Sequence, residues 1–298
     1  MAAPRFLNPG DTVGVVSPGF AVKPALLEQG LARLRRMGYE VVVGDHVLAR
    51  QGYLAGDDGQ RAADLCQMLS RPEVSAIWFA RGGYGTARLL DRVPWAVLRR
   101  DPKLLIGYSD LTALFNAVVD RTPAVCLYGP VVTELGDSGA WHAPSLRALT
   151  SGESLTLRFA RRSVLAEGRS EGRLLGGNLS VLTHLLGTRF APDFRDCILF
   201  LEETGEQTYR VDRMLTQLRQ SGALRRVKGI LLGRLTVPPR RRFPPDRSPE
   251  EVLRETFVPL GVPVVRDLPA GHIPVKRTLP IGAWAILDTT SRTLGFEP

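Results

Sequence analysis

Cysteine is scarce in this sequence, and long apolar runs are missing. The three cysteines, Cys66, Cys126 and Cys197, lie far apart in mostly apolar surroundings. An odd and scattered set argues against a disulfide framework and against a cysteine-rich metal site. No apolar run reaches the ~18 residues of a membrane span, and residues 1–6 lack the apolar core of a secretory signal. We therefore expect a soluble, cytoplasmic protein that does not bind membranes.

Lysine is also rare, although the chain is basic. Four of the 39 basic residues are lysines, and the formal net charge is +9. The arginines are spread along the chain, with one dense cluster at 240–242. There is no recognition helix, RNA-binding aromatic motif or zinc finger, which argues against a nucleic-acid partner. A basic surface that attracts a small acidic substrate is the simpler interpretation.

The first half of the chain alternates strand-like and helix-like segments. Residues 12–17 are β-rich, leucines recur at helical spacing over 24–37, and 39–43 resemble a second strand. This succession predicts a βαβ unit, and hence an α/β fold with a parallel sheet. A chain of 298 residues has room for two domains. We predict one domain over 1–155 and a second over 170–298, with a polar crossing segment over 151–169.

A glycine-rich stretch, Arg81-Gly82-Gly83-Tyr84-Gly85, directly follows a predicted strand over 74–80. Glycines at the carboxyl end of a strand let backbone N–H groups approach a ligand closely. The spacing is neither a dinucleotide fingerprint nor a phosphate-binding P-loop. A turn without a chemical role stays possible. We favour a loop that holds an anion or an oxyanion beside the end of the adjacent strand.

That adjacent strand is predicted over 103–106 and leads into Gly107-Tyr108-Ser109-Asp110-Leu111. Apolar residues then recur at helical spacing up to Val119. A serine that projects from such a strand-to-helix turn, close to the first backbone N–H groups of the helix, has the arrangement of a nucleophile elbow. The second glycine of the familiar Gly-x-Ser-x-Gly pattern is missing, and a serine or aspartate that caps the helix is the commoner outcome. This stretch alone leaves both interpretations open.

Histidine supplies few candidates for a catalytic base. The four histidines are His46, His142, His184 and His272. The first two lie near polar turns and are predicted at the surface, and the third lies among leucines of a predicted helix, which favours packing. His272 differs, because it follows Gly271 at a strand-to-loop junction where a side chain can face a cleft.

Carboxylates follow another buried strand in the second half. The apolar segment 197–201 ends in Glu202 and Glu203. Ser109, one of these glutamates and His272 would form a complete set of nucleophile, orienting carboxylate and base. This chemistry needs no metal, and no cluster at metal-ligand spacing competes with it. We therefore expect no metal and no other cofactor.

A second pair of glycines precedes a polar side chain in the same half. Gly176-Gly177-Asn178 comes before a predicted helix at 179–186. The glycines can bring the backbone close to a ligand, and Asn178 can hydrogen-bond to one. A turn followed by a helix cap explains the same residues equally well.

Together these motifs resemble a known family. The succession is Gly10-Asp11-Thr12-Val13, Arg81-Gly82-Gly83-Tyr84-Gly85, Gly107-Tyr108-Ser109-Asp110-Leu111-Thr112, Gly176-Gly177-Asn178-Leu179, Leu201-Glu202 and Gly271-His272. In this order it is similar to the LD-carboxypeptidases, serine peptidases that include murein tetrapeptide carboxypeptidases and microcin C immunity peptidases. The resemblance implies a Rossmann-like N-terminal domain, a smaller β-rich C-terminal α/β domain and a Ser-Glu-His triad between them.

Carried over by motif, the resemblance implies a role for individual residues. Ser109 matches the nucleophile, His272 the base and Glu202 the orienting carboxylate, with Glu203 as the fallback. The backbone amides of Gly83 and Asp110 match the oxyanion hole. Besides these matches, we predict that Arg81, Tyr84 and Asn178 bind the substrate. Arg81 is expected to attract a substrate carboxylate, although an arginine at the end of a strand is as often a solvated charge.

The implied substrate is a small peptide, a murein tetrapeptide that loses its terminal D-Ala in cell-wall recycling, and the family also implies a homodimer. One alternative within the family is an immunity-type peptidase that cleaves an aminoacyl-nucleotide antibiotic. That activity needs an aromatic side chain to stack on the base, for which Trp141 and Trp284 are loose candidates. Another alternative is a ligand-binding relative without catalytic activity.

Overall fold

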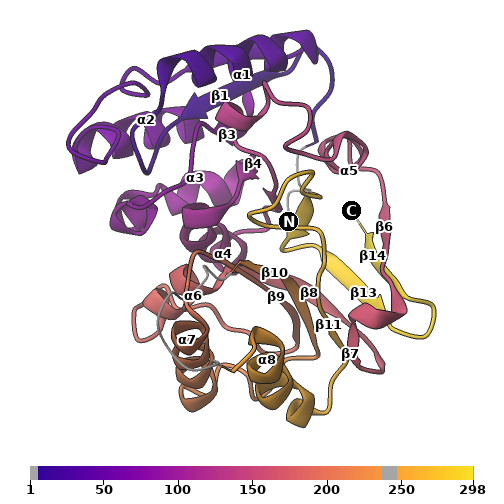
Figure 1. Cartoon of the computed structure of the whole chain (residues 1–298). Coiled ribbons are helices and arrows are strands. Elements are labelled where there is room, and N and C mark those ends of the chain that lie inside the picture. Colours follow the sequence, from indigo (N-terminus) through magenta and orange to yellow (C-terminus); the bar gives the residue numbers. More distant parts are fainter. Residues whose placement is uncertain (1–5, 237–246, 298) are drawn as a thin grey trace. The chain divides into compact units, whose positions relative to one another are not determined.

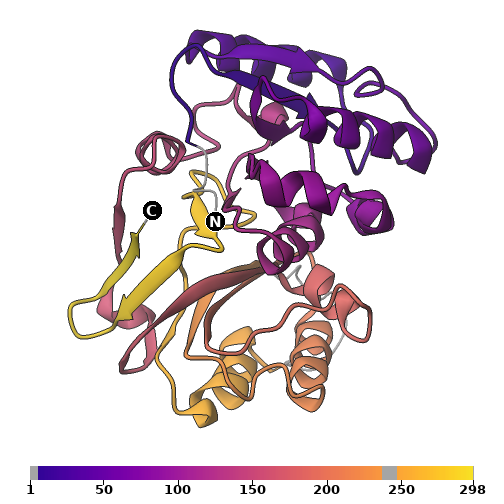
Figure 2. The same cartoon turned by 180° about the vertical axis from the view of Figure 1, so that it is seen from behind.

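The computed structural model describes residues 6–236 and 247–297, and the chain divides into two compact units (Figures 1 and 2). The first unit comprises Met1–Glu153 and Pro274–Gly282, and the second comprises Ser154–Ile273 and Ala283–Pro298. Near its C-terminal end the chain therefore leaves the second unit, forms one short segment of the first unit, and then enters the second unit again. The domain boundaries predicted from the sequence contain no such return. The arginine cluster at 240–242 lies outside the described residues.

A six-stranded sheet forms the centre of the first unit, in the order β12-β5-β4-β3-β1-β2. Its strands are β1 (Thr12–Val16), β2 (Glu40–Val43), β3 (Val74–Phe79), β4 (Leu104–Gly107), β5 (Cys126–Tyr128) and β12 (Leu279–Ile281). The first five are parallel, and β12 pairs antiparallel with β5. Because β3 and β4 are buried on both faces, they are continuous apolar runs in the sequence. The predicted α/β fold with a parallel sheet is confirmed.

Helices follow the strands of this sheet, and Figure 1 shows α1 and α2 alongside β1. They are α1 (Pro24–Arg36), α2 (Asp58–Ser70), α3 (Trp95–Arg100), α4 (Thr112–Arg121) and α5 (Ala143–Thr150), with short 3₁₀ turns η1 (Thr86–Arg92), η2 (Ser109–Leu111) and η3 (Val132–Glu134). The predicted leucine stripe of α1 is buried at Leu27, Leu31 and Leu34. A capping box between Asp57 and Gln60 begins α2.

The second unit contains an eight-stranded mixed sheet in the order β6-β14-β13-β8-β9-β10-β11-β7. Its strands are β6 (Leu155–Arg158), β7 (Val164–Ala166), β8 (Arg169–Asn178), β9 (Cys197–Thr204), β10 (Gly229–Thr236), β11 (Val264–Val265), β13 (Trp284–Asp288) and β14 (Thr293–Glu297). Strands β8 to β11 are parallel, and the flanking strands are antiparallel. The expected crossing segment therefore supplies both edge strands, β6 and β7. Edge strands are short and partly exposed, which explains the weak pattern of this segment.

Three helices accompany this sheet: α6 (Leu179–Leu185), α7 (Thr208–Gln220) and α8 (Pro249–Phe257), with 3₁₀ turns η4 (Arg161–Ser163) and η5 (Val258–Leu260). Figure 1 shows α7 and α8 side by side, and residues of the two helices are in contact. The inward stripe of α7 consists of Val211, Leu215 and Leu218. Among the helices of the described residues, none has both the length and the apolar character needed to cross a membrane.

Candidate active site

Ser109 lies at the turn that joins β4 to α4 in the first unit. Its backbone φ is +68°, a left-handed conformation that is uncommon for a residue with a side chain. The Ser109 N–H donates a hydrogen bond to the Tyr128 hydroxyl at 3.1 Å. A Cβ atom at Gly107 would lie 2.2 Å from a terminal methyl carbon of Leu111, so a side chain there would force Leu111 to move. Tyr108 is the N-cap residue of η2 and Leu111 that of α4, and neither makes a side-chain capping bond. Of the two interpretations left open by the sequence, the structure therefore does not support the helix cap.

The glycine-rich loop lies against this serine. Strands β3 and β4 are parallel neighbours, so their carboxyl ends meet at one edge of the sheet. A Cβ atom at Gly82 would be 3.0 Å from the Cβ of Ser109 and 3.4 Å from its Oγ. Gly83 has a φ of +111°, and a Cβ there would overlap the ring of Phe20. Because Gly82 and Gly83 have no side chains, the loop backbone can pack directly against Ser109 and Phe20.

Buried charged groups hold the loop on both sides. The Asp110 carboxylate is buried and accepts a hydrogen bond from the Thr86 N–H at 2.8 Å. Burial raises the pKa of Asp110. The fully buried Arg61 guanidinium donates to the Gly85 carbonyl at 3.1 Å, and it also binds the Pro18 carbonyl. Arg61 was not among the residues predicted from the sequence, although its spacing from Leu65 and Met68 places it on the inward stripe of α2.

The two remaining predicted residues of the loop occupy its outer part. Arg81 donates to the Ala21 carbonyl at 2.9 Å, and its guanidinium lies 5.6 Å from the centre of the Phe20 ring. Tyr84 is exposed and contacts the Tyr53 ring at a centroid distance of 6.1 Å. Their predicted role in substrate binding stays a prediction.

In the second unit, Glu202 contacts His272. Glu202 lies near the end of β9, where the sheet register pairs it with Asn178, and its side chain is inaccessible to solvent. One carboxylate oxygen lies 2.8 Å from His272 Nδ1 and accepts the His272 backbone N–H at 3.2 Å. This contact favours the tautomer with the proton on Nδ1 and the lone pair on Nε2. The imidazole is partly exposed, as a base that meets a substrate must be.

Gly271 allows this contact by having no side chain. Its φ is +95°, and a Cβ atom at this position would lie 2.5 Å from the Glu202 carboxylate. Both the backbone conformation and the available space therefore require glycine next to His272.

The neighbouring Glu203 has other partners. It accepts the Ser180 N–H at 2.8 Å and the Ser180 hydroxyl at 2.7 Å, at the start of α6. The amide of Asn178 donates to Glu202 at 3.3 Å and to Glu203 at 3.2 Å, and its oxygen accepts the Val181 N–H at 3.2 Å. Glu202 is therefore the carboxylate at His272, whereas Glu203 holds the first turn of α6. Substrate binding by Asn178 stays a prediction.

Two of the other histidines have structural contacts. The sequence predicts that the third, His184, packs among the leucines of its helix, but it is exposed on α6, so that prediction is wrong. His46, expected to be a plain surface residue, pairs with Asp64 at 2.8 Å. His142 accepts the Ser145 N–H at 3.2 Å at the start of α5, and burial lowers its pKa. In the described part of the chain, no group of three or more His, Cys, Asp or Glu residues is placed to hold a metal ion.

The predicted catalytic residues thus form two groups. Ser109 lies with the glycine-rich loop and Asp110 in the first unit, and Glu202 lies with His272 in the second. The first group offers a hydroxyl beside backbone amides, and the second offers an oriented imidazole. These are the parts that acyl transfer through a serine requires.

Comparison with known proteins covers both units. The family model described as the LD-carboxypeptidase N-terminal domain matches residues 13–129, and the one for the C-terminal domain matches residues 171–287. The murein tetrapeptide carboxypeptidase of Pseudomonas aeruginosa is 35% identical, over 93% of this chain and 92% of its own length.

Solved structures agree with this assignment. The muramoyltetrapeptide carboxypeptidase from Oxalobacter formigenes has a TM-score of 0.85 and is 30% identical, with 96% of this chain and 99% of that chain covered. The microcin C7 self-immunity protein MccF of Escherichia coli, in complex with aspartyl sulfamoyl adenosine, has a TM-score of 0.90 at 23% identity, with 100% and 99% covered. The latter similarity shows the fold. The chain therefore belongs to the LD-carboxypeptidase family and is a serine-type carboxypeptidase.

Proposed function

We propose that this carboxypeptidase removes the terminal D-Ala from murein tetrapeptides in the cytoplasm, as part of cell-wall recycling. The relatives from P. aeruginosa and O. formigenes support this substrate, since their names specify tetrapeptide carboxypeptidases and their similarity extends over nearly the whole chain. The net charge of +9 supports it further, because a basic protein attracts an acidic peptide.

The contact between Glu202 and His272 is the observation that carries the proposed mechanism. In this mechanism, Ser109 Oγ attacks the carbonyl carbon of the scissile amide while His272 Nε2 takes the hydroxyl proton. Glu202 keeps the imidazole in the required tautomer and stabilises its protonated form. The backbone N–H groups of Gly83 and Asp110 bind the oxyanion, and losing one such donor typically costs about 3 kcal/mol of transition-state stabilisation.

The intermediate then collapses as the C–N bond breaks and His272 delivers its proton to the departing amine of D-Ala. The rest of the peptide stays on Ser109 as an ester. A water molecule, deprotonated by His272, hydrolyses this ester and returns Ser109 to its hydroxyl form.

The connectivity of the chain supports joint action of the two groups of residues. His272 stands two residues before Pro274, where the chain re-enters the unit that contains Ser109. Lys276, in the returning segment, donates to Glu134 at 2.8 Å and to the Ala140 carbonyl at 3.2 Å. The segment that follows the proposed base is thus anchored in the nucleophile's own unit.

Substrate recognition is assigned to Arg81, Tyr84 and Asn178. Arg81 would attract the terminal carboxylate, which distinguishes a carboxypeptidase from an endopeptidase. The Tyr84 ring offers an exposed apolar surface at the same loop. Asn178, whose amide contacts Glu202, would reach both the triad and the bound peptide.

Release of D-Ala from a murein tetrapeptide tests the proposal. The unmodified chain should release stoichiometric D-Ala, and Ser109→Ala should reduce kcat by about 10⁶-fold, as for loss of the nucleophile in other serine peptidases. Ser221→Ala, at an exposed serine after α7, is the matched control and should be fully active. Full hydrolysis by Ser109→Ala would refute the mechanism. Labelling of Ser109 by a fluorophosphonate would exclude a non-catalytic relative.

Cleavage of an aminoacyl-nucleotide remains the alternative activity within the family. Of the two aromatic candidates, Trp141 is buried in the first unit, and Trp284 is exposed on β13. Turnover of the tetrapeptide and of an aspartyl-adenylate analogue should be compared, and a preference for the latter would favour the alternative. The homodimer implied by the family also stays a proposal, which sedimentation equilibrium tests directly.

A further inference from the structure

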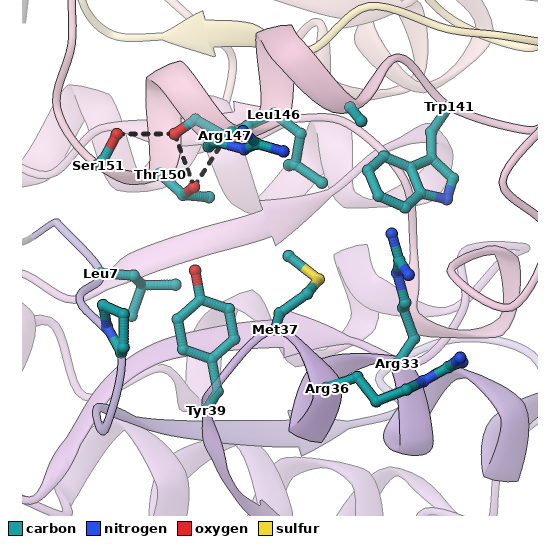
Figure 3. Close-up of a pocket in the computed structure, with 12 residues that line it drawn as sticks. Leu7, Arg33, Arg36, Met37, Tyr39, Trp141, Leu146, Arg147, Thr150 and Ser151 are labelled. Atoms are coloured by element: carbon teal, nitrogen blue, oxygen red, sulfur yellow. Dashed lines mark hydrogen bonds between the residues drawn. The ribbon is translucent and has the colours of Figure 1, made fainter.

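A cavity lies within the first unit, and no residue of the glycine-rich loop or of the Ser109 turn lines it. It has a volume of about 400 Å³, which falls within the range of small-molecule sites. Arg33, Arg36 and Tyr39 line it from the end of α1 and the segment that follows (Figure 3). Trp141 and Arg147 line it from α5 and the segment before that helix. No residue of the proposed catalytic groups is part of its lining.

The charged residues that line this cavity are all basic. They are Arg33, Arg36 and Arg147, and no aspartate or glutamate is part of the lining. Within residues 6–236 and 247–297, none of the three forms an ion pair. The like charges of the three arginines repel one another, and a bound anion would offset this repulsion because it attracts each of them.

Two buried N–H donors at the cavity lack an acceptor. Trp141 Nε1 and Arg33 Nε are both buried, and neither has a hydrogen-bond partner in the described part of the chain. The Arg33 guanidinium lies 5.5 Å from the centre of the Trp141 indole ring, so the two donors belong to side chains that contact each other. Unsatisfied buried donors are rare because each has lost its hydrogen bonds to water. The wall of the cavity therefore contains two buried donors that have no acceptor of their own among the described residues.

Apart from Thr150 and Ser151, the rest of the lining is apolar or aromatic. Figure 3 shows Trp141 with Arg33 at one end, Tyr39 near Thr150 at the other, and Met37 between them. Flat rings and a thioether favour a flat apolar body, and guanidinium groups bind carboxylates and phosphates through paired N–H donors.

We propose that this cavity binds a small organic anion, with a carboxylate or phosphate at the arginines and a flat apolar body against Trp141 and Tyr39. The site is separate from the proposed catalytic residues and does not depend on the proposed function.

Protein labelled with 5-fluorotryptophan tests the site by ¹⁹F NMR. The chain has four tryptophans, and the Trp141 resonance is identified by its loss in Trp141→Phe. The probes are indole-3-acetate and phenyl phosphate, compared with neutral indole-3-acetamide and with inorganic phosphate. The two organic anions should shift the Trp141 resonance alone, with submillimolar dissociation constants, and the amide should shift nothing. The tighter of the two anions identifies the preferred charged group.

Substitution of the arginines provides a second test of the proposed site. Arg33→Gln and Arg147→Gln should each weaken binding about tenfold or more, the size expected for loss of a charged hydrogen bond. Arg35→Gln is the matched control, because Arg35 is an exposed arginine of α1 that does not line the cavity. Four dispersed ¹⁹F resonances in each variant show that it is folded. No shift at Trp141 with either anion, equal binding of the amide, or an equal loss in Arg35→Gln would overturn the proposal.

Discussion

Two histidine–carboxylate pairs in this protein have nearly the same geometry. In the first unit, His46 Nδ1 lies 2.8 Å from an Asp64 oxygen, and the His46 backbone N–H donates to the same carboxylate at 2.9 Å. In the second unit, the corresponding distances between His272 and Glu202 are 2.8 Å and 3.2 Å. Each pair even has a glycine, Gly44 or Gly271, at which a Cβ atom would lie 2.5 Å from the carboxylate.

Both carboxylates are buried, and the difference between the pairs lies in the element that carries the carboxylate. Asp64 projects from the helix α2, and its partner His46 is 35% exposed. Glu202 is inaccessible at the end of a central parallel strand, where ligands of such sheets bind, and Asn178 donates to its second oxygen. The comparison teaches that a short contact between an imidazole and a carboxylate does not define a catalytic pair. The definition of a catalytic pair must also include the position of the pair in the fold.

The largest expected contrast comes from removing each imidazole. His272→Gln should lower kcat/KM for D-Ala release by about 10⁴-fold or more, because no other group is assigned to take the serine proton. His46→Gln removes an imidazole with the same contacts and should leave kcat/KM unchanged. Steady-state kinetics on both variants measure the difference. Equal losses would mean that the wrong pair has been assigned to catalysis.

Removing each carboxylate gives the next largest contrast. Glu202→Gln should lower kcat by about 10³- to 10⁴-fold, since the amide cannot stabilise a protonated imidazole. Glu203→Gln should instead lower the free energy of unfolding by about 1–2 kcal/mol through the weakened start of α6, and retain most of kcat. Kinetics and urea unfolding separate the two outcomes. A greater loss of kcat in Glu203→Gln would reverse the assignment of the orienting residue.

A smaller effect is expected from the glycine beside the base. Gly271→Ala should lower kcat by about 10²-fold, because the new methyl group displaces Glu202 and a displacement near 1 Å has that typical cost. Gly261→Ala is the matched control: its φ is also positive, at +68°, but a Cβ there meets no atom within 4 Å. It should cost about 1 kcal/mol of stability and no activity. Equal kinetics for the two variants would show that Gly271 does not position Glu202.

Sequence alone predicted those features of the site that depend on local pattern. The apolar runs identified β3, β4 and β9, and the ends of parallel strands are where ligands bind, so the predicted loop and Ser109 lie together. Because successive side chains of a strand point to opposite faces of the sheet, the sequence predicts that Glu202 and Glu203 face opposite ways. It does not say which faces the base, because that depends on the register with Asn178 and on the path of the loop that carries His272.

Features that depend on contacts between distant segments could not be predicted. The return of Pro274–Gly282 to the first unit carries a three-residue strand, β12, which is too short for a periodic pattern. The buried Arg61 depends on carbonyl acceptors at Pro18 and Gly85, 43 and 24 residues away. The His46–Asp64 pair likewise joins a turn to a helix 18 residues later. In each case the partner that makes the residue stable belongs to another segment.

The smallest expected effect concerns the pH dependence of stability in the non-catalytic pair. The hydrogen bond to Asp64 raises the pKa of His46 above its ordinary value of about 6.5. Since the folded state holds the proton more tightly, the stabilisation is fully present below the ordinary pKa and is lost as the pH rises through the raised one. His46→Gln should therefore lower the urea midpoint at pH 5 and leave it unchanged at pH 9. His142 has the opposite sign, because burial lowers its pKa and protonation then favours unfolding. The stability difference between the unmodified chain and His142→Gln should therefore shrink as the pH falls, and a parallel pH dependence for both variants would contradict the assignment of these two environments.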